Sequence, residues 1–313
     1  MSHVVITSCS SSKSISKERR VSAEDLHKGQ INEVASEWVG MLSESSTSIC
    51  CGQLYQGRGV QEIKRAASEL ECRVWFISAG LGLVSIDQTV PAYNLTVSKG
   101  SSDFVGDKIV TLPFDSYFWW QEINKICGNT TLNALINEHN DKLFLLALPT
   151  NYFAMIAPEL MQLTDANLSR VRLFGPSKSK IDERFHNILM PYDNRLNGPD
   201  SPLRGTYSDF SQRALHHFVS IIDNKLQVRK AANDRQLVSD SLNKMRLPLV
   251  ISRIKATDEE ISLILQKNWA KCSGPPTKLL RQLRDVELTA CEQKRFNGIF
   301  HSVNILMGEK HAR

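Results

Sequence analysis

Residues 4–15 read VVITSCSSSKSI, an apolar run that passes directly into a row of hydroxyl side chains. The β-branched residues predict a buried strand over 3–8, because short apolar runs bounded by polar residues are typical of such strands. Cys9 follows this strand at once, and Ser10 and Lys13 lie in the turn after it. By residue type alone, Cys9 is either a nucleophile activated by its polar surroundings or a small buried hydrophobic residue.

Three more apolar runs predict strands, and they read CRVWFISAG (72–80), DKLFLLALPT (141–150) and SRVRLFGPS (169–177). Helical periodicity is found between the strands, over 32–42, 61–70, 119–126, 131–138 and 151–163. The alternation predicts an α/β fold with a mainly parallel or mixed central sheet flanked by helices. Ligands bind such sheets beyond the carboxyl ends of the strands. We therefore expect Cys9 to lie near the residues that follow the other strands.

The charge of the chain is unevenly distributed and suggests two domains. The total is +5, but residues 241–313 carry 13 Lys and Arg against 7 Asp and Glu, which leaves the first 240 residues close to neutral. We predict an α/β domain over 1–240 and a small basic helical module over 250–313, with Pro248 near the boundary. A neutral body with a basic module indicates an anionic partner for the module.

The module has the pattern of three short helices separated by tight turns. Thr257 and Glu260 form a capping box at the start of the first, and the whole is compatible with a helix-turn-helix or winged module. Five cations at helical spacing are predicted to contact DNA phosphates: Lys278, Arg281, Arg284, Lys294 and Arg295. The alternative is a solvated helical surface used for oligomerisation or capping.

Composition excludes several classes of protein. The 313 residues are 42% hydrophobic and 23% charged, as in ordinary globular proteins. No apolar run approaches the roughly 20 residues that cross a bilayer, and no secretory signal is recognised. The seven cysteines form no CxxC pair, so we expect reduced thiols, a cytoplasmic location and no membrane partner. The scattered histidines predict no metal site, and GLG at 80–82 lacks the third glycine of a dinucleotide fingerprint, so no cofactor is expected.

Two further stretches carry candidate ligand-binding residues. LYQGRGV (54–60) holds Tyr55 and Arg58, which could grip a planar heterocycle or a phosphate. In ISAGLGLVSIDQTVPAYNL (77–95), the small residues around Ser78 and Gly80 could let the backbone approach a ligand. Asp87 and Tyr93 would then reach back toward the same pocket.

Residues 191–213 are rich in Pro, Gly, Asp and Asn, which predicts a long loop. Acids and arginines alternate in it: Asp193, Arg195, Asp200, Arg204, Asp209 and Arg213. One interpretation is a loop held by its own ion pairs. The other is a lid in which Asp193 acts as a general acid or base while Arg195 and Arg213 bind substrate.

Residues 3–97 resemble a family that is distantly related to the peroxide-stress protein YaaA. The family pattern is a strand ending in C-S-x-x-K, then L-Y, then S-A-x-x-G-L and then P-Y-D, and the chain has TSCSSSK, LYQGR and ISAGLGLVSIDQTVPAYNL. It departs from the pattern at Asn94, where the family usually has Asp, and at AGLG, where a Lys-His pair commonly precedes the glycine.

The 191–213 loop and the basic C-terminal module resemble the DpdC family, from the bacterial system that places 7-deazaguanine bases in DNA. This resemblance implies a nitrile hydratase that converts 7-cyano-7-deazaguanine in DNA to the 7-amido base. The implied partner is DNA that contains the cyano base, and other proteins of the same system could take part.

Two routes could hydrate such a nitrile. Cys9 could attack the carbon to form a thioimidate that water releases, or Asp193 or Asp87 could activate water directly. In either route Lys13 or Tyr93 could supply the proton. Two other functions remain open: a DNA-binding stress protein without catalysis, and an enzyme that acts on another base, such as a glycosidase.

Overall fold

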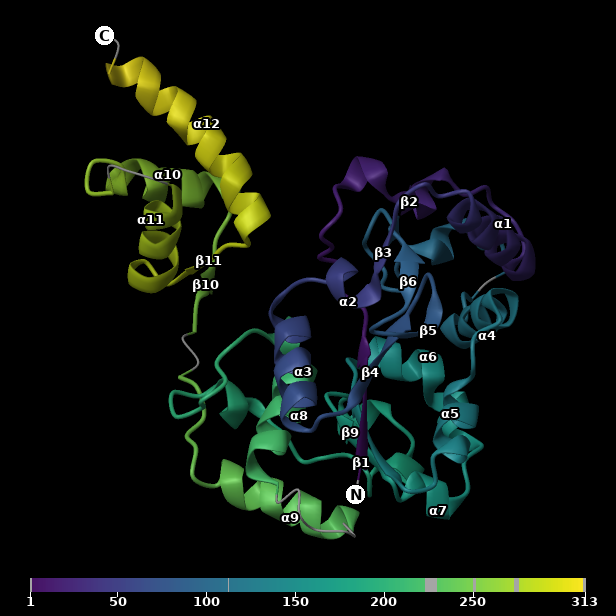
Figure 1. The fold of residues 1–313 in the computed structure, drawn as a ribbon. Helices are drawn as coiled ribbons and strands as arrows, with labels where there is room; N and C mark the ends of the chain where they lie inside the picture. Colours follow the sequence, from purple (N-terminus) through teal and green to yellow (C-terminus); the bar gives the residue numbers. More distant parts are fainter. Residues whose placement is uncertain (1, 112, 223–229, 250–251, 273–275, 312–313) are drawn as a thin grey trace. The chain divides into compact units, whose positions relative to one another are not determined.

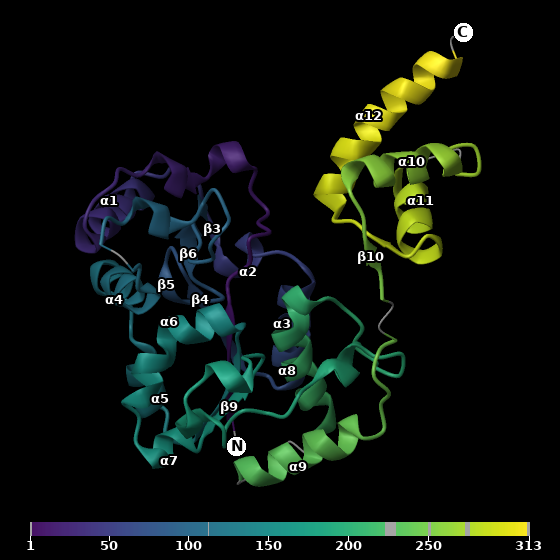
Figure 2. The ribbon, with the colours of Figure 1, turned by 180° about the vertical axis from the view of Figure 1, so that it is seen from behind.

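The structure is a computed structural model that describes residues 2–111, 113–222, 230–249, 252–272 and 276–311. The chain forms two compact units, Met1–Pro248 and Leu249–Arg313, and each has its own apolar core. Figures 1 and 2 show the elements of both units from opposite sides. Among the described residues, no helix combines the length and the apolar character needed to cross a membrane.

Unit 1 contains a five-stranded mixed sheet in the order β5-β4-β1-β8-β9. The strands are β1 (Ser2–Ser8), β4 (Arg73–Ser78), β5 (Gly82–Ser85), β8 (Lys142–Ala147) and β9 (Val171–Phe174). Four of them run parallel, and β5 is antiparallel to β4. This confirms the predicted α/β fold with a mixed central sheet, and each of the four predicted strands is present.

The central strand β1 is buried along nearly its whole length, from His3 to Ser8. It pairs with β4 on one side and with β8 on the other, so that Val5 lies opposite both Val74 and Leu145. A parallel strand covered on both faces requires a nearly continuous apolar run. The Val-Val-Ile run of β1 meets this requirement.

Helices cover both faces of the sheet, as Figure 1 shows. On one face α3 (Arg58–Glu69) and α8 (Phe210–Ile221) pack together; on the other α6 (Thr150–Met161) contacts α4 (Ser116–Cys127) and α5 (Leu132–Glu138), and α1 (Ile31–Ser43) contacts α4. Besides short 3-10 helices, the described residues of unit 1 also form α2 (Cys51–Leu54), α7 (Asp165–Leu168), α9 (Ala231–Leu242) and the strand pairs β2 (Val21–Ser22) with β7 (Tyr93–Asn94) and β3 (Ser48–Cys50) with β6 (Thr89–Pro91).

Residues 79–81 form the tight hairpin turn between β4 and β5, and Gly82 is the first residue of β5. Gly82 has φ +75°, and a Cβ added there would lie 2.4 Å from Oδ1 of Asn124. That oxygen accepts a hydrogen bond from the backbone N–H of Leu83 at 2.9 Å. Glycine is therefore needed for both the left-handed backbone and the close approach of α4.

The acidic and basic residues of the 191–213 loop pair largely with one another. Arg195 Nη2 lies 2.8 Å from Asp193 Oδ2, and Arg213 Nε lies 2.7 Å from Asp209 Oδ1. Arg213 is fully buried and donates all five of its N–H groups, to Asp209, the side chain of Asn197 and the carbonyls of Leu196, Leu203 and Thr206. Arg213 therefore fastens the loop to α8.

Unit 2 packs three helices and a two-stranded parallel pair around a small core. The elements are β10 (Ile254–Lys255), α10 (Asp258–Asn268), α11 (Pro276–Arg281), the π-helical turn η8 (Gln282–Val286), β11 (Thr289–Ala290) and α12 (Gln293–His311). The capping box of Thr257 and Glu260 starts α10 as predicted. Trp269, Phe300 and Phe296 form a stack, with ring centroids 5.5 and 5.8 Å apart.

Arg213→Met should lower the free energy of unfolding by about 3–5 kcal/mol, because the buried Asp209 carboxylate loses its close ion partner and keeps only the exposed Arg58 at 3.9 Å, while the loop carbonyls lose their donors. Arg195→Met is the matched control in the same loop. It breaks a largely solvated pair and should cost about 0–1 kcal/mol. Urea unfolding followed by circular dichroism measures both, and equal losses would contradict the role given to Arg213.

Candidate active site

The carboxyl ends of the parallel strands bring Cys9 close to residues from distant parts of the sequence. Cys9 directly follows β1, Ala79 follows β4 and Leu148 follows β8. The backbone N–H of Cys9 donates to the carbonyl of Ile77 at 3.0 Å. The strand ladder thus continues through Cys9 and holds its backbone at the edge of the sheet.

A hollow of about 390 Å³ opens above Cys9. Its walls are the turn Cys9–Lys13, residues from the segment 94–103, and Tyr152 from the first turn of α6. The volume lies within the range of ordinary small-molecule sites. We call it the Cys9 hollow.

The thiol of Cys9 contacts a buried phenol. Its Sγ lies 3.1 Å from the hydroxyl oxygen of Tyr152, whose residue is only 8% exposed. Burial, followed by the negative charge that Cys9 would carry if ionised, raises the pKa of Tyr152 well above its usual value. The phenol therefore stays protonated near neutral pH and can donate a hydrogen bond to sulfur.

Lys13 brings an amine to the same hollow. Its Nζ donates to the carbonyl of Ser10 at 3.2 Å and lies 4.6 Å from the ring centroid of Tyr93, within cation–π distance. Burial lowers the pKa of Lys13, a negative charge on Cys9 would oppose this shift, and the charge of Arg20 reinforces it. An ammonium with a lowered pKa releases a proton more readily than an exposed lysine does.

Three predicted site residues form a buried hydroxyl chain beneath the hollow. Tyr55 and Tyr93 are fully buried, with hydroxyl oxygens 2.8 Å apart, and the Tyr93 hydroxyl lies 2.6 Å from Ser78 Oγ. Ser78 Oγ in turn accepts from the backbone N–H of Leu81 at 3.0 Å. These residues support Lys13 and the β4–β5 turn, and because their rings are buried they cannot stack on a ligand.

Gly80 also has a packing role that differs from the predicted one. A Cβ at this position would lie 2.6 Å from the ring of Tyr93 and 3.2 Å from that of Trp38. The carbonyl of Gly80 accepts from Trp38 Nε1 at 2.7 Å. Glycine at this position allows the rings of Tyr93 and Trp38 to pack directly against the backbone of the turn. The close approach made possible by Gly80 is therefore to these two side chains and not to a ligand.

The other predicted site residues lie elsewhere. Asp87 is exposed in the turn after β5, because the antiparallel course of that strand carries the chain away from the carboxyl edge. Arg58 is exposed at the start of α3, with its Nε 3.9 Å from Asp209. Asp193 and Arg195 form an ion pair with each other, and the N–H groups of Arg213 all donate to acceptors in the loop. The described residues that line the Cys9 hollow include none of these five.

The residues that sequence reasoning missed are Tyr152 and Asp103. Tyr152 lies five residues beyond the end of β8, in a helix that was predicted without assigning it a role. Its place after a parallel strand was an available signal, since residues there face the carboxyl edge. Asp103 lines the hollow from a loop, and its negative charge acts to raise the pKa of Lys13.

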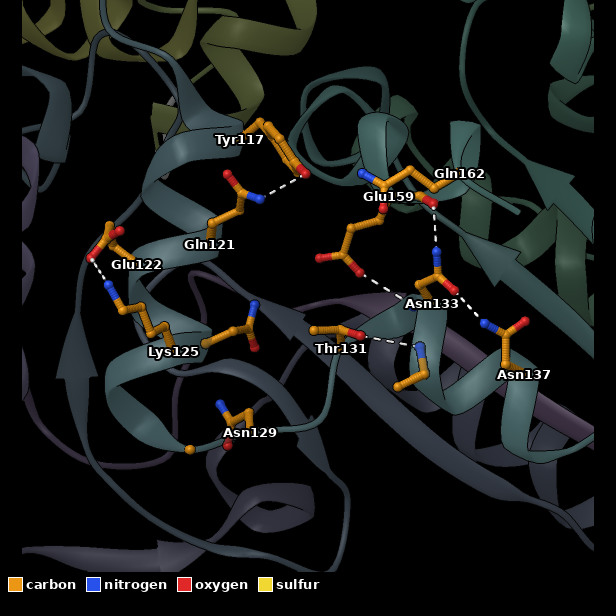
Figure 3. Close-up of a pocket in the computed structure, with 13 residues that line it drawn as sticks. Tyr117, Gln121, Glu122, Lys125, Asn129, Thr131, Asn133, Asn137, Glu159 and Gln162 are labelled. Carbon is orange, nitrogen blue, oxygen red and sulfur yellow. Dashed lines mark hydrogen bonds and ion pairs between the residues drawn. The ribbon is translucent and has the colours of Figure 1, made fainter. Parts of the chain in front are cut away.

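A second hollow, of about 730 Å³, lies between α4 and α5 (Figure 3). Its walls include six Asn and Gln side chains, and Glu159 points into it from α6. The carboxylate accepts from Trp120 Nε1 at 2.6 Å and from the backbone N–H of Asn133 at 3.3 Å. These bonds brace α4 and α5 against α6, so we assign the hollow a structural role although it is larger than the Cys9 hollow.

Tyr152→Phe should slow the alkylation of Cys9 by iodoacetamide roughly fivefold, because a hydrogen bond that stabilises the thiolate over the thiol is worth about 1 kcal/mol. Peptide mass spectrometry reports the rate, with Cys127 of α4 as an internal standard outside the hollow. An unchanged ratio of Cys9 to Cys127 labelling would show that the phenol does not act on the thiolate.

Comparisons with known proteins do not assign a function, so an assignment has to be argued from the residues described above. No family model, no curated protein and no solved structure matches the chain.

Proposed function

We propose that the chain is a nitrile hydratase that converts 7-cyano-7-deazaguanine in DNA to the 7-amido base, with Cys9 as the nucleophile. The observation that carries the proposal is the meeting of a thiol, a protonated phenol and an amine in one hollow, from Cys9, Tyr152 and Lys13. The choice of substrate is supported by two resemblances. The TSCSSSK, LYQGR and SAGLG motifs resemble the YaaA-related family, and the 191–213 loop and the basic module resemble the DpdC family.

The first step is addition of the thiol across the nitrile. The Cys9 sulfur bonds to the carbon, one π bond of C≡N breaks, and the thiol proton goes to nitrogen, which gives a thioimidate. Lys13 or Tyr152 can relay this proton, since both face the hollow. Donors placed where charge develops on nitrogen stabilise the transition state.

Water then adds to the thioimidate carbon to give a tetrahedral intermediate that bears –OH, –NH₂ and the sulfur. Loss of the thiol, with the hydroxyl proton passing to sulfur, leaves the amide and restores Cys9. Loss of ammonia would instead leave a thioester and lead to an acid. The Tyr152 hydroxyl lies 3.1 Å from the sulfur and can donate a hydrogen bond to it as the C–S bond breaks, which favours departure of sulfur and the amide as the product.

The direct-water route has less support from the positions of the side chains. Asp87 is exposed on the turn after β5, and Asp193 is engaged by Arg195. Partial burial opposes the shift, but the hydrogen bonds from Arg195 lower the pKa of Asp193 overall, which makes it a weaker base. The thiolate route is therefore the one we propose.

The base must leave the stack or present its 7-substituent in the major groove to reach the thiol. Stacking by Tyr55 or Phe76 is not available to it, because both rings are fully buried. The polar walls of the Cys9 hollow, with Ser10, Thr96 and Asp103, offer hydrogen bonds to the edge of a flipped base in place of stacking.

Incubation with duplex DNA that contains the cyano base, followed by nucleoside mass spectrometry, tests the proposal. With the wild-type protein, the cyano nucleoside should gain the mass of one water. Cys9→Ala should lower turnover by about 10³-fold or more, as in other enzymes from which the nucleophile is removed. Cys127→Ala, Asp87→Asn and Asp193→Asn are controls that should retain activity.

Each of the other outcomes has a distinct meaning. Full turnover by Cys9→Ala and Cys9→Ser would exclude the thiolate route. Release of free base would indicate a glycosidase, and DNA binding without any change in mass would indicate a stress protein that does not act on the base.

A further inference from the structure

We propose that a basic hollow on unit 2, lined by Arg253, Lys255, Arg284 and Arg295, binds the phosphodiester backbone of DNA. The inference rests on the proposed function in taking DNA as the ligand, and it names a site of contact. The hollow measures about 640 Å³, and the one acid among its described lining residues is Glu292. Two of its four cations, Arg253 and Lys255, were not among the predicted DNA-binding residues.

The local backbone gathers these side chains. Arg284 belongs to the π-helical turn η8, and Leu288, two residues beyond that turn, has φ +48°, a left-handed value that is uncommon for a branched side chain. Leu288 directly precedes β11, and its carbonyl accepts from the backbone N–H of Ile254 at 2.7 Å. This bond starts the pairing of β10 with β11, and Arg253 directly precedes β10 while Lys255 is its last residue.

Backbone carbonyls hold the three guanidinium groups in place. Arg284 donates twice to the carbonyl of Cys291, at 3.0 and 2.7 Å, and Arg253 Nε donates to the carbonyl of Arg284 at 2.8 Å. Arg295 Nη2 donates to the carbonyl of Ala256 at 2.8 Å. Side chains held in this way lose less conformational entropy when they bind an anion.

Donors remain for a ligand after these bonds are made. Within the part of the chain that the structure describes, Nη1 of Arg253, Arg284 and Arg295 and Nζ of Lys255 have no acceptor. Asp285 and Asp258 neutralise part of the charge of Arg253 and Arg295 from outside the hollow. Several unused donors in one hollow suit the oxygens of phosphate, which accept hydrogen bonds from guanidinium groups in paired geometry.

The other predicted DNA-binding residues are less suited to this role. Lys278 and Arg281 are exposed on α11, outside the described lining of the basic hollow. Lys294 lines a neighbouring hollow together with Asp258, Glu259 and Glu292, three acids that would repel a phosphate. We therefore place the main phosphate contact at the basic hollow and not on α11.

Lys255→Glu in the full-length protein tests the proposal, with Lys271→Glu as a control of equal charge change on an exposed lysine of the same unit. Binding to a fluorescent, unmodified duplex is followed by anisotropy over about 50 to 300 mM KCl. Lys255→Glu should weaken binding about tenfold and flatten the plot of log K against log[salt] by roughly one, as for the loss of one phosphate contact. Lys271→Glu should change the affinity less than about twofold.

Two further measurements keep the result distinct from the catalytic proposal. Cys9→Ala should bind this duplex as tightly as the unmodified protein, because no cyano base is present. Arg284→Lys, which keeps the charge but loses the fork, should weaken binding several-fold, with thermal melting as the check on folding. Equal effects of Lys255→Glu and Lys271→Glu, or no binding of the duplex by the unmodified protein, would overturn the inference; in the second case an acidic protein surface becomes the ligand to test.

Discussion

The candidate site depends on the pairing of β1 between β4 and β8. The pairing is parallel on both sides, so all three strands end at the same edge of the sheet. It continues one residue further through the bond from the Cys9 backbone N–H to Ile77. A thiol on a free loop would sample many positions, whereas this one sits on a backbone held by the core. Preorganisation of this kind is what a nucleophile needs.

Lys13 is held close to that thiol by a second constraint, the aromatic pair under the turn. An isolated β bridge joins Lys13 to Tyr55, and the amine lies over the face of Tyr93. Withdrawing an ammonium from water is costly, and the aromatic faces and the Ser10 carbonyl offset part of that cost. The two tyrosines of the sequence motifs therefore have a structural role, because they hold Lys13 in the turn that also carries Cys9.

The sequence predicted the strands and the residues that follow them, because apolar runs and strand ends are local features. It could not reveal that β5 turns back antiparallel, and this reversal is what removes Asp87 from the site. The extent of burial also cannot be read from a single sequence: the sequence left Arg213 either paired within its loop or available to a substrate, and the structure shows it fully buried by that loop. Tyr152 was missed because its contact with Cys9 spans 143 positions and exists only once β8 lies beside β1.

The two units have separate apolar cores, so in the proposed function binding by one and chemistry on the other would be adjustable independently. Extruding a base from duplex DNA costs a few kcal/mol, and the Cys9 hollow, with its polar walls and buried tyrosines, has little aromatic surface with which to offset that cost. Backbone contacts made by unit 2 would provide affinity that does not depend on the base and would raise the effective concentration of DNA at unit 1 through the covalent link. Under the proposed function, the hollow would then need to discriminate only the nitrile-bearing base from its neighbours, and a few hydrogen bonds and one thiol would suffice for this.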